Sequence, residues 1–359
     1  MHRFGINHRR AAIAHEAVAR LALSSLDGVE LLLEIADLVM PVVPFESAGL
    51  VLLDPETFLM AGGETLGPIG RHVPLMLRNE LLSSDVHKLR ELAQRELPIA
   101  TMSSLGALAW ESSERRVEIL DRIGVGDELR VVLRHNRSSW GFACMSRASD
   151  TNAFDADEVL FMRQIAAAAA PALQRSLTRR TTVESAATPG VMLVNSDLQI
   201  ASMSASAERW QRLMPAYAAM AVQSVAVRAQ DPAADESSRR IRVRLTNGEW
   251  LTMHSAPLDD VPGRSGLTVV TLTLTEGSDL AQLMMRVYGL SRREREVVGL
   301  LLGGLSNDVI AKRLSIVRHT LLDHQKSIFG KVGVNTRAEL TVALAGRTPA
   351  ASPAGFGSS

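Results

Sequence analysis

The sequence of 359 residues contains a single cysteine, Cys144, and no long uncharged apolar run. One cysteine cannot form an internal disulfide, and it excludes a multi-cysteine zinc or iron–sulfur site, as expected in a reducing compartment. No apolar stretch approaches the roughly 18 residues of a membrane-spanning helix, and no signal-peptide core follows the basic N-terminus. We therefore expect a cytoplasmic protein that makes no membrane contact.

Catalytic and metal-binding motifs are missing as well. The nine histidines are scattered, and none lies in a close cluster with cysteine or acidic residues. The chain contains neither a phosphate-binding loop nor a nucleophile elbow. Cys144 lies in an apolar segment, which is typical of an inert core thiol. The sequence therefore predicts no catalytic residue, no metal and no cofactor, and a protein that is not an enzyme.

The length predicts two or three domains. We expect a flexible tail over residues 1–14 and an α+β domain over residues 15–180. In that domain, helical spacing from residue 15 to 40 breaks near 24–28, and a further helix is expected at 81–95. Strand-like segments occupy 48–54, 127–135 and 140–147. A long helix starts at a capping box of Asp155 and Glu158, and Pro171 should bend or interrupt it.

A second α+β domain is expected over residues 181–278, with the order strand, strand, helix, helix and three strands. The dipeptide Asn247-Gly248 is typical of a two-residue type I′ hairpin. That register pairs Thr246 with Glu249, and it places four residues on one face: Ile241, Val243, Leu245 and Trp250. The low-complexity end of the chain, residues 348–359, is expected to be a disordered tail.

The neutral net charge hides an asymmetry. Residues 283–347 contain eleven lysines and arginines but five aspartates and glutamates, an excess of six positive charges. Because the whole chain is neutral, the remainder carries an equal negative excess. A basic block attached to an acidic body is typical of a domain that faces phosphates.

Residues 283–347 are predicted to form four short helices. Ser291 and Glu294 form a capping box for the first helix, and Gly303-Gly304 ends it. Ser306 can cap the second helix, and Thr336 with Glu339 can begin the fourth. In the third helix, Leu321, Ile328, Phe329 and Val332 are expected to point inward. Helices this short must pack together to be stable.

The third helix should expose a polar face suited to the major groove of double-stranded DNA. Basic residues around it are expected to contact phosphates and fix its register. An ordinary small helical bundle with a solvated face is the alternative. The candidate DNA-binding residues are Lys312, Arg313, Arg318, His319, Thr320, Leu322, Asp323, Lys326, Ser327, Lys331 and Arg337.

This block resembles the LuxR-type helix-turn-helix domain through LSRRERE from Leu290, GLSN from Gly304, KVGV from Lys331 and RAEL from Arg337. The resemblance implies a scaffold helix at 306–314, a recognition helix at 318–331, and a helix at 338–344 that often dimerises. It also implies a bacterial DNA-binding transcription regulator, a homodimer that works with RNA polymerase. Three departures stand out: Val317 replaces a capping serine, Leu322 a basic residue, and Gln325 an apolar one.

The two preceding domains resemble GAF-like and PAS-like sensory domains. The first resemblance rests on residues 127–147 and the following helix with Phe154 and Glu158, and the second on 190–210 and 242–258. The expected fold class is therefore multidomain α+β with a C-terminal all-α helix-turn-helix domain. Both folds usually enclose a small-molecule ligand or act as dimerisation and relay modules, so the sensory domains are expected to modulate DNA binding.

Two other function classes stay open. A sigma-factor-like initiation protein has similar helices, but it also needs a basic, aromatic-rich promoter-binding region, and aromatic residues are 4% of this chain. A GAF-linked signalling enzyme would need a catalytic motif. On the recognition helix, Asp323 and Lys326 lie one turn apart on the same face. Asp323 either accepts a hydrogen bond from cytosine or merely pairs with a neighbouring basic residue.

Overall fold

The structure is a computed structural model that describes residues 6–21, 23–178, 188–258, 266–275 and 277–344. The chain divides into two compact units, the first built mainly from residues 1–177, 186–246 and 250–274, and the second mainly from 275–359. The expected α+β architecture, with antiparallel sheets and a helical C-terminal domain, is confirmed. None of the helices in the described ranges has the length and apolar composition needed to cross a membrane.

The first sheet has five antiparallel strands in the order β2-β1-β5-β4-β3. Three of them were expected, and they are strands in which most side chains are buried. The other two were missed, because β2 carries two glycines and a glutamate and β3 has three residues. The strands are β1 (Ser47–Leu53), β2 (Met60–Leu66), β3 (Ile99–Thr101), β4 (Val125–His135) and β5 (Ser138–Ala148).

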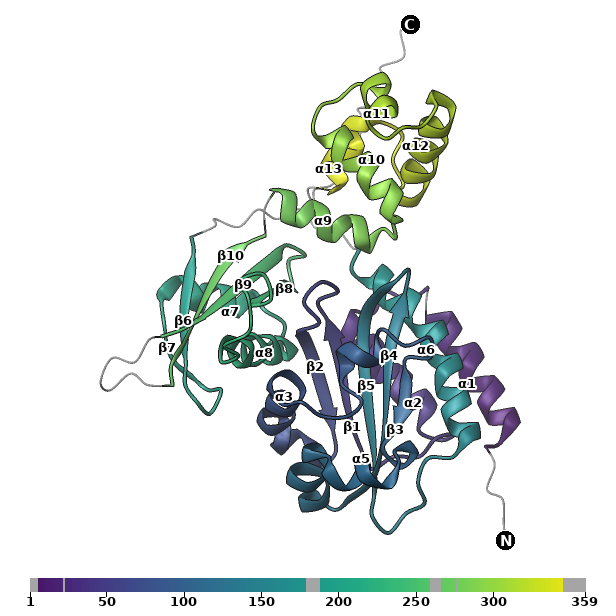
Figure 1. Ribbon diagram of the computed structural model, residues 1–359, viewed down its shortest axis with the longest axis vertical. Helices are drawn as coiled ribbons and strands as arrows, with labels where there is room; N and C mark the ends of the chain where they lie inside the picture. Colours follow the sequence, from purple (N-terminus) through teal and green to yellow (C-terminus); the bar gives the residue numbers. More distant parts are fainter. Residues whose placement is uncertain (1–5, 22, 179–187, 259–265, 276, 345–359) are drawn as a thin grey trace, which may run out of the picture. The chain divides into compact units, whose positions relative to one another are not determined.

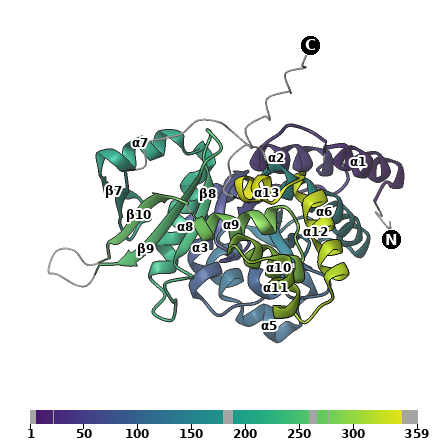
Figure 2. The same cartoon turned by 90° about the horizontal axis from the view of Figure 1, so that it is seen from above.

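Helices α2 (Gly28–Val39) and α6 (Ala156–Ser176) pack against one face of this sheet, and α1 (His8–Leu21) packs against both of these helices. They lie side by side in both views (Figure 1, Figure 2). The flexible tail predicted over residues 1–14 is wrong from His8 onward, because Ala11 and Ala14 of α1 are buried. Residues 1–5 lie outside the described residues, as does the predicted tail at 348–359.

Helix α6 begins at the predicted capping box of Asp155 and Glu158 and contains Pro171 in its interior. Of the two effects expected of Pro171, a bend or an interruption, the interruption does not occur. Proline removes one helical hydrogen bond, but apolar residues on both sides of it, including Phe161, Ile165 and Leu173, are buried against the sheet and α1. Packing of these side chains therefore stabilises the helix on both sides of the proline.

The opposite face of the sheet is covered by shorter segments, of which η1 (Pro68–His72), α3 (Val73–Leu82) and α4 (Leu89–Leu92) are nearest in sequence to β2. The single helix predicted at 81–95 is wrong. A polar turn separates α3 from α4, in which Asp85 accepts hydrogen bonds from Asn79 and from the Arg115 backbone, and Glu80 accepts one from the Leu89 backbone. Helix α5 (Ala107–Ser112), two 3-10 turns (Met102–Ser104 and Asp121–Ile123) and a π-turn (Arg116–Leu120) complete this region.

The second sheet has the order β7-β6-β10-β9-β8 and is also antiparallel. The expected succession of strands and helices is confirmed, with an added 3-10 turn at Ala216–Ala218. The elements are β6 (Gly190–Val194), β7 (Ile200–Met203), α7 (Ala205–Leu213), α8 (Ala219–Ala229), β8 (Arg240–Arg244), β9 (Trp250–Pro257) and β10 (Thr268–Leu274).

The β8–β9 hairpin differs from its prediction by one residue of register. Arg244 pairs with Trp250 and Val243 with Leu251, so Trp250 does not share a face with Val243. Gly248 has φ of 84°, whereas Asn247 is outside the left-handed region, so the turn is not type I′. A pair of left-handed residues does occur between β4 and β5, where Asn136 and Arg137 have φ of 50° and 62° and the flanking residues are paired.

The two sheets of the first unit share one hydrophobic core. Helix α8 packs against β9 and β10 of its own sheet and also against β2 and α3, and one buried cluster runs from Val51 and Met60 to Val225 and Leu272. The hydroxyl oxygen of Ser224, in α8, accepts a hydrogen bond from the Met60 backbone at 3.0 Å. These contacts explain why the two sheets form a single compact unit.

A buried ion pair also joins the two sheets. The Arg242 guanidinium in β8 donates to both oxygens of Asp54, at 2.9 and 2.8 Å, and both side chains are 1% exposed. Burial by itself would raise the pKa of Asp54, but Arg242 and backbone hydrogen bonds outweigh it and lower the pKa. The carboxylate is therefore charged and depends on its arginine.

We predict that Arg242→Met lowers the free energy of unfolding by about 3–5 kcal/mol, because it leaves the Asp54 charge buried without its partner. The double variant Asp54→Asn/Arg242→Met should recover part of that loss, since it removes both charges. Urea unfolding followed by tryptophan fluorescence measures both. A single variant as stable as the wild type would show that the pair does not hold the sheets together.

Candidate nucleic-acid interface

The second unit contains five helices in its described residues: α9 (Gly277–Val287), α10 (Arg292–Leu302), α11 (Asn307–Arg313), α12 (Arg318–Val332) and α13 (Arg337–Leu344). The last four were predicted. Helix α9 was missed because the predicted domain began at 283, inside it, and α9 packs against α13. The core is formed by fully buried apolar side chains from α10 to α13: Val297, Val298, Ile310, Leu321, Ile328 and Leu340.

Four of these helices, α9 to α12, end in the same way. Gly289, Gly304, Ser315 and Gly333 have φ of 67°, 84°, 54° and 72°. In each case the next residue donates its backbone N–H to the carbonyl five positions back, at 3.0, 3.3, 3.0 and 3.0 Å. This is the Schellman motif, which satisfies carbonyls at a helix end and turns the chain sharply. It keeps the turns between α10, α11 and α12 short, as a helix-turn-helix requires.

Glu294 joins α10 to α12. As predicted, it forms a capping box with Ser291 at the start of α10. Its carboxylate also accepts hydrogen bonds from the Ser327 hydroxyl at 2.7 Å and from the Lys331 ammonium at 2.9 and 2.7 Å. Burial by itself would raise the pKa of Glu294, but the hydrogen bonds from Lys331, Ser327 and Ser291 outweigh it and lower the pKa to about 2.

Arg337 has a comparable internal role at the start of α13. Its guanidinium donates to the carbonyl oxygens of Leu305, at 3.0 Å, and of Leu301. These carbonyls lie in the last turn of α10 and just after it, where the regular i to i+4 hydrogen bonds of the helix end. Arg337 therefore ties α13 to the end of α10.

The other predicted DNA-binding residues lie along α11 and α12, in the bundle that Figure 1 shows at the C-terminal end of the described chain. Thr320 and Arg337 are half-buried. The exposed ones are Lys312, Arg313, Arg318, His319, Leu322, Asp323, Lys326, Ser327 and Lys331. The structure thus gathers His319, Leu322, Asp323 and Lys326 on one exposed face of α12.

Some of these residues have partners within the unit. Ser327 and Lys331 are held by Glu294, at the edge of the α12 face. On the face itself, a nitrogen of His319 lies 3.5 Å from an Asp323 oxygen, one turn away. Arg318 lies 3.5 Å from Asp308 of α11. All four side chains of these last two pairs are at least 64% exposed, so such contacts add little to stability and can be exchanged for contacts to DNA.

The three departures noted in the sequence have distinct structures. Val317 begins α12 without a side-chain hydrogen bond, and Leu322 is exposed. Gln325 donates to the Asn307 side chain at 2.8 Å, which links α12 to the first residue of α11. Sequence reasoning missed this amide pair, because it depends on residues that the turn brings together.

We predict that Glu294→Gln lowers the free energy of unfolding of the C-terminal unit by about 1.5–3 kcal/mol at pH 7, since it weakens charge-assisted hydrogen bonds. The folded-state pKa, about 2, lies below the value of about 4.3 in an unfolded chain. The advantage of the wild type is therefore complete above about pH 4.3 and disappears as the pH falls toward 2.

Urea unfolding of residues 275–359, followed by circular dichroism from pH 7 to pH 2, measures this difference. The exposed carboxylate of the same helix supplies a control, Glu296→Gln, which should change stability less at pH 7. A Glu294→Gln variant that keeps the full stability and the acid dependence of the wild type would contradict this role.

Comparisons with known proteins agree with this geometry. Residues 289–344 match the family described as "Bacterial regulatory proteins, luxR family". An HTH-type transcriptional regulator named for the exeN 3′ region of Aeromonas salmonicida is 45% identical over 65 residues, which are 18% of this chain and 33% of the relative. The regulatory protein named SgaR of Hyphomicrobium methylovorum is 30% identical over 119 residues, 31% of this chain and 53% of the relative. The chain thus spans between a third and about half of these relatives.

Among solved structures, SdiA in complex with octanoyl-rac-glycerol is 13% identical, with 93% of this chain and 94% of that chain covered and a TM-score of 0.36. A GAF domain/HD domain protein from Geobacter sulfurreducens is 15% identical, with 40% and 91% covered and a TM-score of 0.26. Likenesses at these TM-scores carry no argument about the fold. The family match and the geometry of α10 to α13 carry it: residues 289–344 form a LuxR-family helix-turn-helix domain.

Proposed function

We propose that this protein is a sequence-specific, DNA-binding transcription regulator. The observation that carries the proposal is the LuxR-family match over residues 289–344. In that domain α12 presents an exposed polar face instead of an apolar one. Both curated relatives are named as transcriptional regulators.

The proposal places α12 in the major groove, because an α-helix fits that groove and base edges carry a readable pattern of donors and acceptors there. His319, Asp323 and Lys326 would then face the bases or the nearest phosphates. Lys312, Arg313 and Arg318 are exposed at the ends of α11 and α12 and would contact phosphates. Lys331 and Arg337 would act chiefly by holding α12 and α13 against α10.

The proposal extends to the first unit, whose two sheets we infer to be GAF-like and PAS-like sensory domains that modulate DNA binding. The support is their element order and the alternation of strands and helices in each. We further propose a homodimer in the bacterial cytoplasm that works with RNA polymerase. A dimer would double the contacts of a domain that reads a short half-site.

We predict that full-length protein binds duplex DNA with an affinity that falls steeply with salt, because basic side chains displace counterions. Lys326→Ala should weaken binding to every sequence, and it should flatten the plot of log affinity against log salt by about one unit if the lysine contacts a phosphate. Binding isotherms at several salt concentrations measure this slope.

The matched control is Arg137→Gly, which removes one exposed positive charge from the β4–β5 turn, where residue 137 is left-handed. Its slope should equal that of the wild type, since this turn belongs to the first unit. Equal slopes for all three proteins would rule out a phosphate contact at Lys326. Undiminished binding by residues 1–274 alone would remove the C-terminal domain as the DNA-binding part.

We predict that Asp323→Ala relaxes base preference at one position of each half-site, with a loss of discrimination of about 1–3 kcal/mol. A carboxylate near DNA can accept a hydrogen bond, most suitably from cytosine N4, but it repels phosphates. Selection from a random DNA library, with wild type and variant in parallel, gives the two sequence logos. Identical logos would leave Asp323 only its contact with His319, and a logo without two-fold symmetry would argue against binding as a symmetric homodimer.

A further inference from the structure

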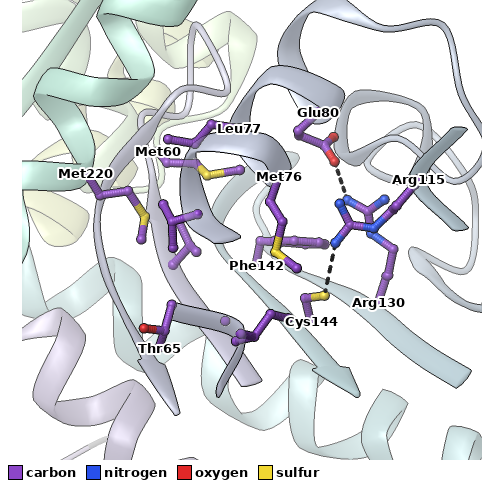
Figure 3. A pocket seen from close by; sticks show the side chains of 14 residues that line it. Met60, Thr65, Met76, Leu77, Glu80, Arg115, Arg130, Phe142, Cys144 and Met220 are labelled. Carbon is purple, nitrogen blue, oxygen red and sulfur yellow. Dashed lines mark hydrogen bonds and ion pairs between the residues drawn. The ribbon is translucent and has the colours of Figure 1, made fainter. Parts of the chain in front are cut away.

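A cavity lies on the face of the first sheet opposite α1, α2 and α6. Strand register puts two rows of residues on that face: Arg130, Cys144, Gly49 and Thr65 in one, and Val132, Phe142, Val51 and Gly63 in the next. Six of these eight residues line this cavity. Its other walls come from η1, α3, Met60 of β2, Met220 of α8 and Arg115 (Figure 3).

Gly49 supplies the first indication that the cavity receives a ligand. It lies in the interior of β1, where glycine weakens a strand and often marks the close approach of another group. A Cβ built on Gly49 would meet nothing within 4 Å. By contrast, a Cβ on Gly63, in the neighbouring row, would lie 2.5 Å from the Leu50 carbonyl oxygen. Packing therefore explains Gly63 but leaves Gly49 unexplained, and it leaves space beside β1.

Arg130 supplies the second, independent indication. Its side chain is 1% exposed and forms an ion pair with Glu80, and its guanidinium lies over the Phe142 ring, 5.0 Å from the centroid. Its Nη1 atom has no hydrogen-bond partner among the described residues, whereas its Nε, also without a hydrogen bond, lies 3.7 Å from an oxygen of Glu128. Buried donors are costly when unpaired, and Figure 3 shows this guanidinium at one end of the cavity. A ligand atom that accepts a hydrogen bond would satisfy it.

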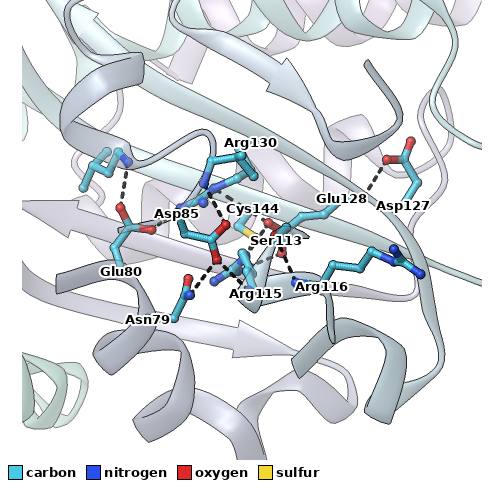
Figure 4. A network of polar contacts seen from close by, with 12 residues as sticks. Asn79, Glu80, Asp85, Ser113, Arg115, Arg116, Asp127, Glu128, Arg130 and Cys144 are labelled. Atoms are coloured by element: carbon cyan, nitrogen blue, oxygen red, sulfur yellow. Dashed lines mark hydrogen bonds and ion pairs between the residues drawn. The ribbon is translucent and has the colours of Figure 1, made fainter. Parts of the chain in front are cut away.

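The charges around Arg130 determine which acceptor fits. Arg115 donates to both oxygens of Glu128, at 2.8 Å each, and both side chains are buried (Figure 4). The cations and anions of this network cancel in formal charge: Lys88, Arg115 and Arg130 against Glu80, Asp85 and Glu128. An added carboxylate would bring an unbalanced charge into a site with apolar walls, which is costly. An uncharged carbonyl oxygen would satisfy the N–H without that cost.

The apolar walls indicate the rest of the ligand. Met60, Met76 and Met220 line the cavity together with Phe142. Methionine sulfur makes favourable contacts with aromatic rings, and its flexible side chain adapts to a flat ligand. We propose that this cavity binds a small uncharged aromatic compound whose carbonyl oxygen accepts a hydrogen bond from Arg130. The proposal rests on the sensory role proposed for the first unit and deepens it by naming a ligand class, while occupancy of the cavity does not depend on DNA.

Three compounds of similar shape test the proposal: acetophenone, benzoate and isopropylbenzene, which present a carbonyl, a carboxylate and no acceptor. Each is titrated into full-length protein whose methionine methyl groups are ¹³C-labelled, and binding is followed by NMR. Acetophenone should shift the signals of Met60, Met76 and Met220, with a Kd at least tenfold below those of the other two compounds.

The variant Gly49→Val tests whether acetophenone binds in this cavity, because it fills the open space with a side chain that suits a strand. It should weaken acetophenone binding at least tenfold while the other methionine signals keep their positions. The control Gly106→Val adds the same atoms at the N-cap of α5, also into open space, but outside the cavity, and it should bind as the wild type does.

Four results would overturn the proposal: tightest binding of benzoate, equal binding of isopropylbenzene, no binding of any compound at millimolar concentration, or unchanged binding by a folded Gly49→Val. If Gly49→Val does not fold, the comparison of the three compounds and the position of the shifted methionine signals in the wild type still decide it. Because none of these measurements contains DNA, their outcome is separate from that of the proposed function.

Discussion

The arrangement of the helices in the C-terminal unit depends on the hydrogen bonds that the Glu294 carboxylate accepts. One side chain starts α10 through its capping box and holds α12 through Ser327 and Lys331. The position of α12 relative to the rest of the bundle is therefore fixed at the same point where α10 begins. A reading helix is useful only if its exposed face is presented at a constant angle, and a charged, nearly buried group provides that rigidity better than a surface pair would.

Local signals in the sequence predicted much of this structure. Capping boxes at Ser291 and Asp155 marked helix starts, and glycines at 304 and 333 lie at helix ends. These features work through neighbours within a few residues, so they are visible in one sequence. The LuxR-type resemblance then assigned a scaffold role and a recognition role to two of the four predicted helices. Strands β2 and β3 were missed because β2 carries two glycines and a glutamate and β3 has only three residues.

In the candidate site, too, features set by neighbouring residues were predicted, and contacts between distant residues were not. Periodicity alone placed His319, Leu322 and Lys326 on an exposed face, since helix geometry decides it. It could not show that Lys331 and Arg337 are engaged with Glu294 and with the end of α10, because these partners lie in or just after a different helix. The β8–β9 register was predicted wrongly for a related reason: Asn-Gly suits several turns, and neighbouring strands select among them.

The two sheets of the first unit have the same strand order although the sequence contains no evident repeat. The second strand in each order, β1 in one sheet and β6 in the other, contains a glycine, and the surroundings of the two glycines differ. In β6, a Cβ on Gly190 would lie 2.7 Å from the Ala207 backbone, so close helix packing requires glycine there. In β1, Gly49 faces open space. In the second sheet, α7 therefore packs directly on this strand. In the first sheet, the corresponding strand borders the cavity that Arg130 also lines.

The shared core has a consequence for the growing chain on the ribosome. The buried cluster that includes Met60 of β2 and Leu77 of α3 is completed by α8, and it continues to β10, which ends at Leu274. About 100 residues must therefore emerge after α6 before this core can close, which takes about 5–20 s at ordinary rates of synthesis. During that interval apolar surface is open to chaperones and to other nascent chains. A protein cut after α6 would keep that exposure permanently.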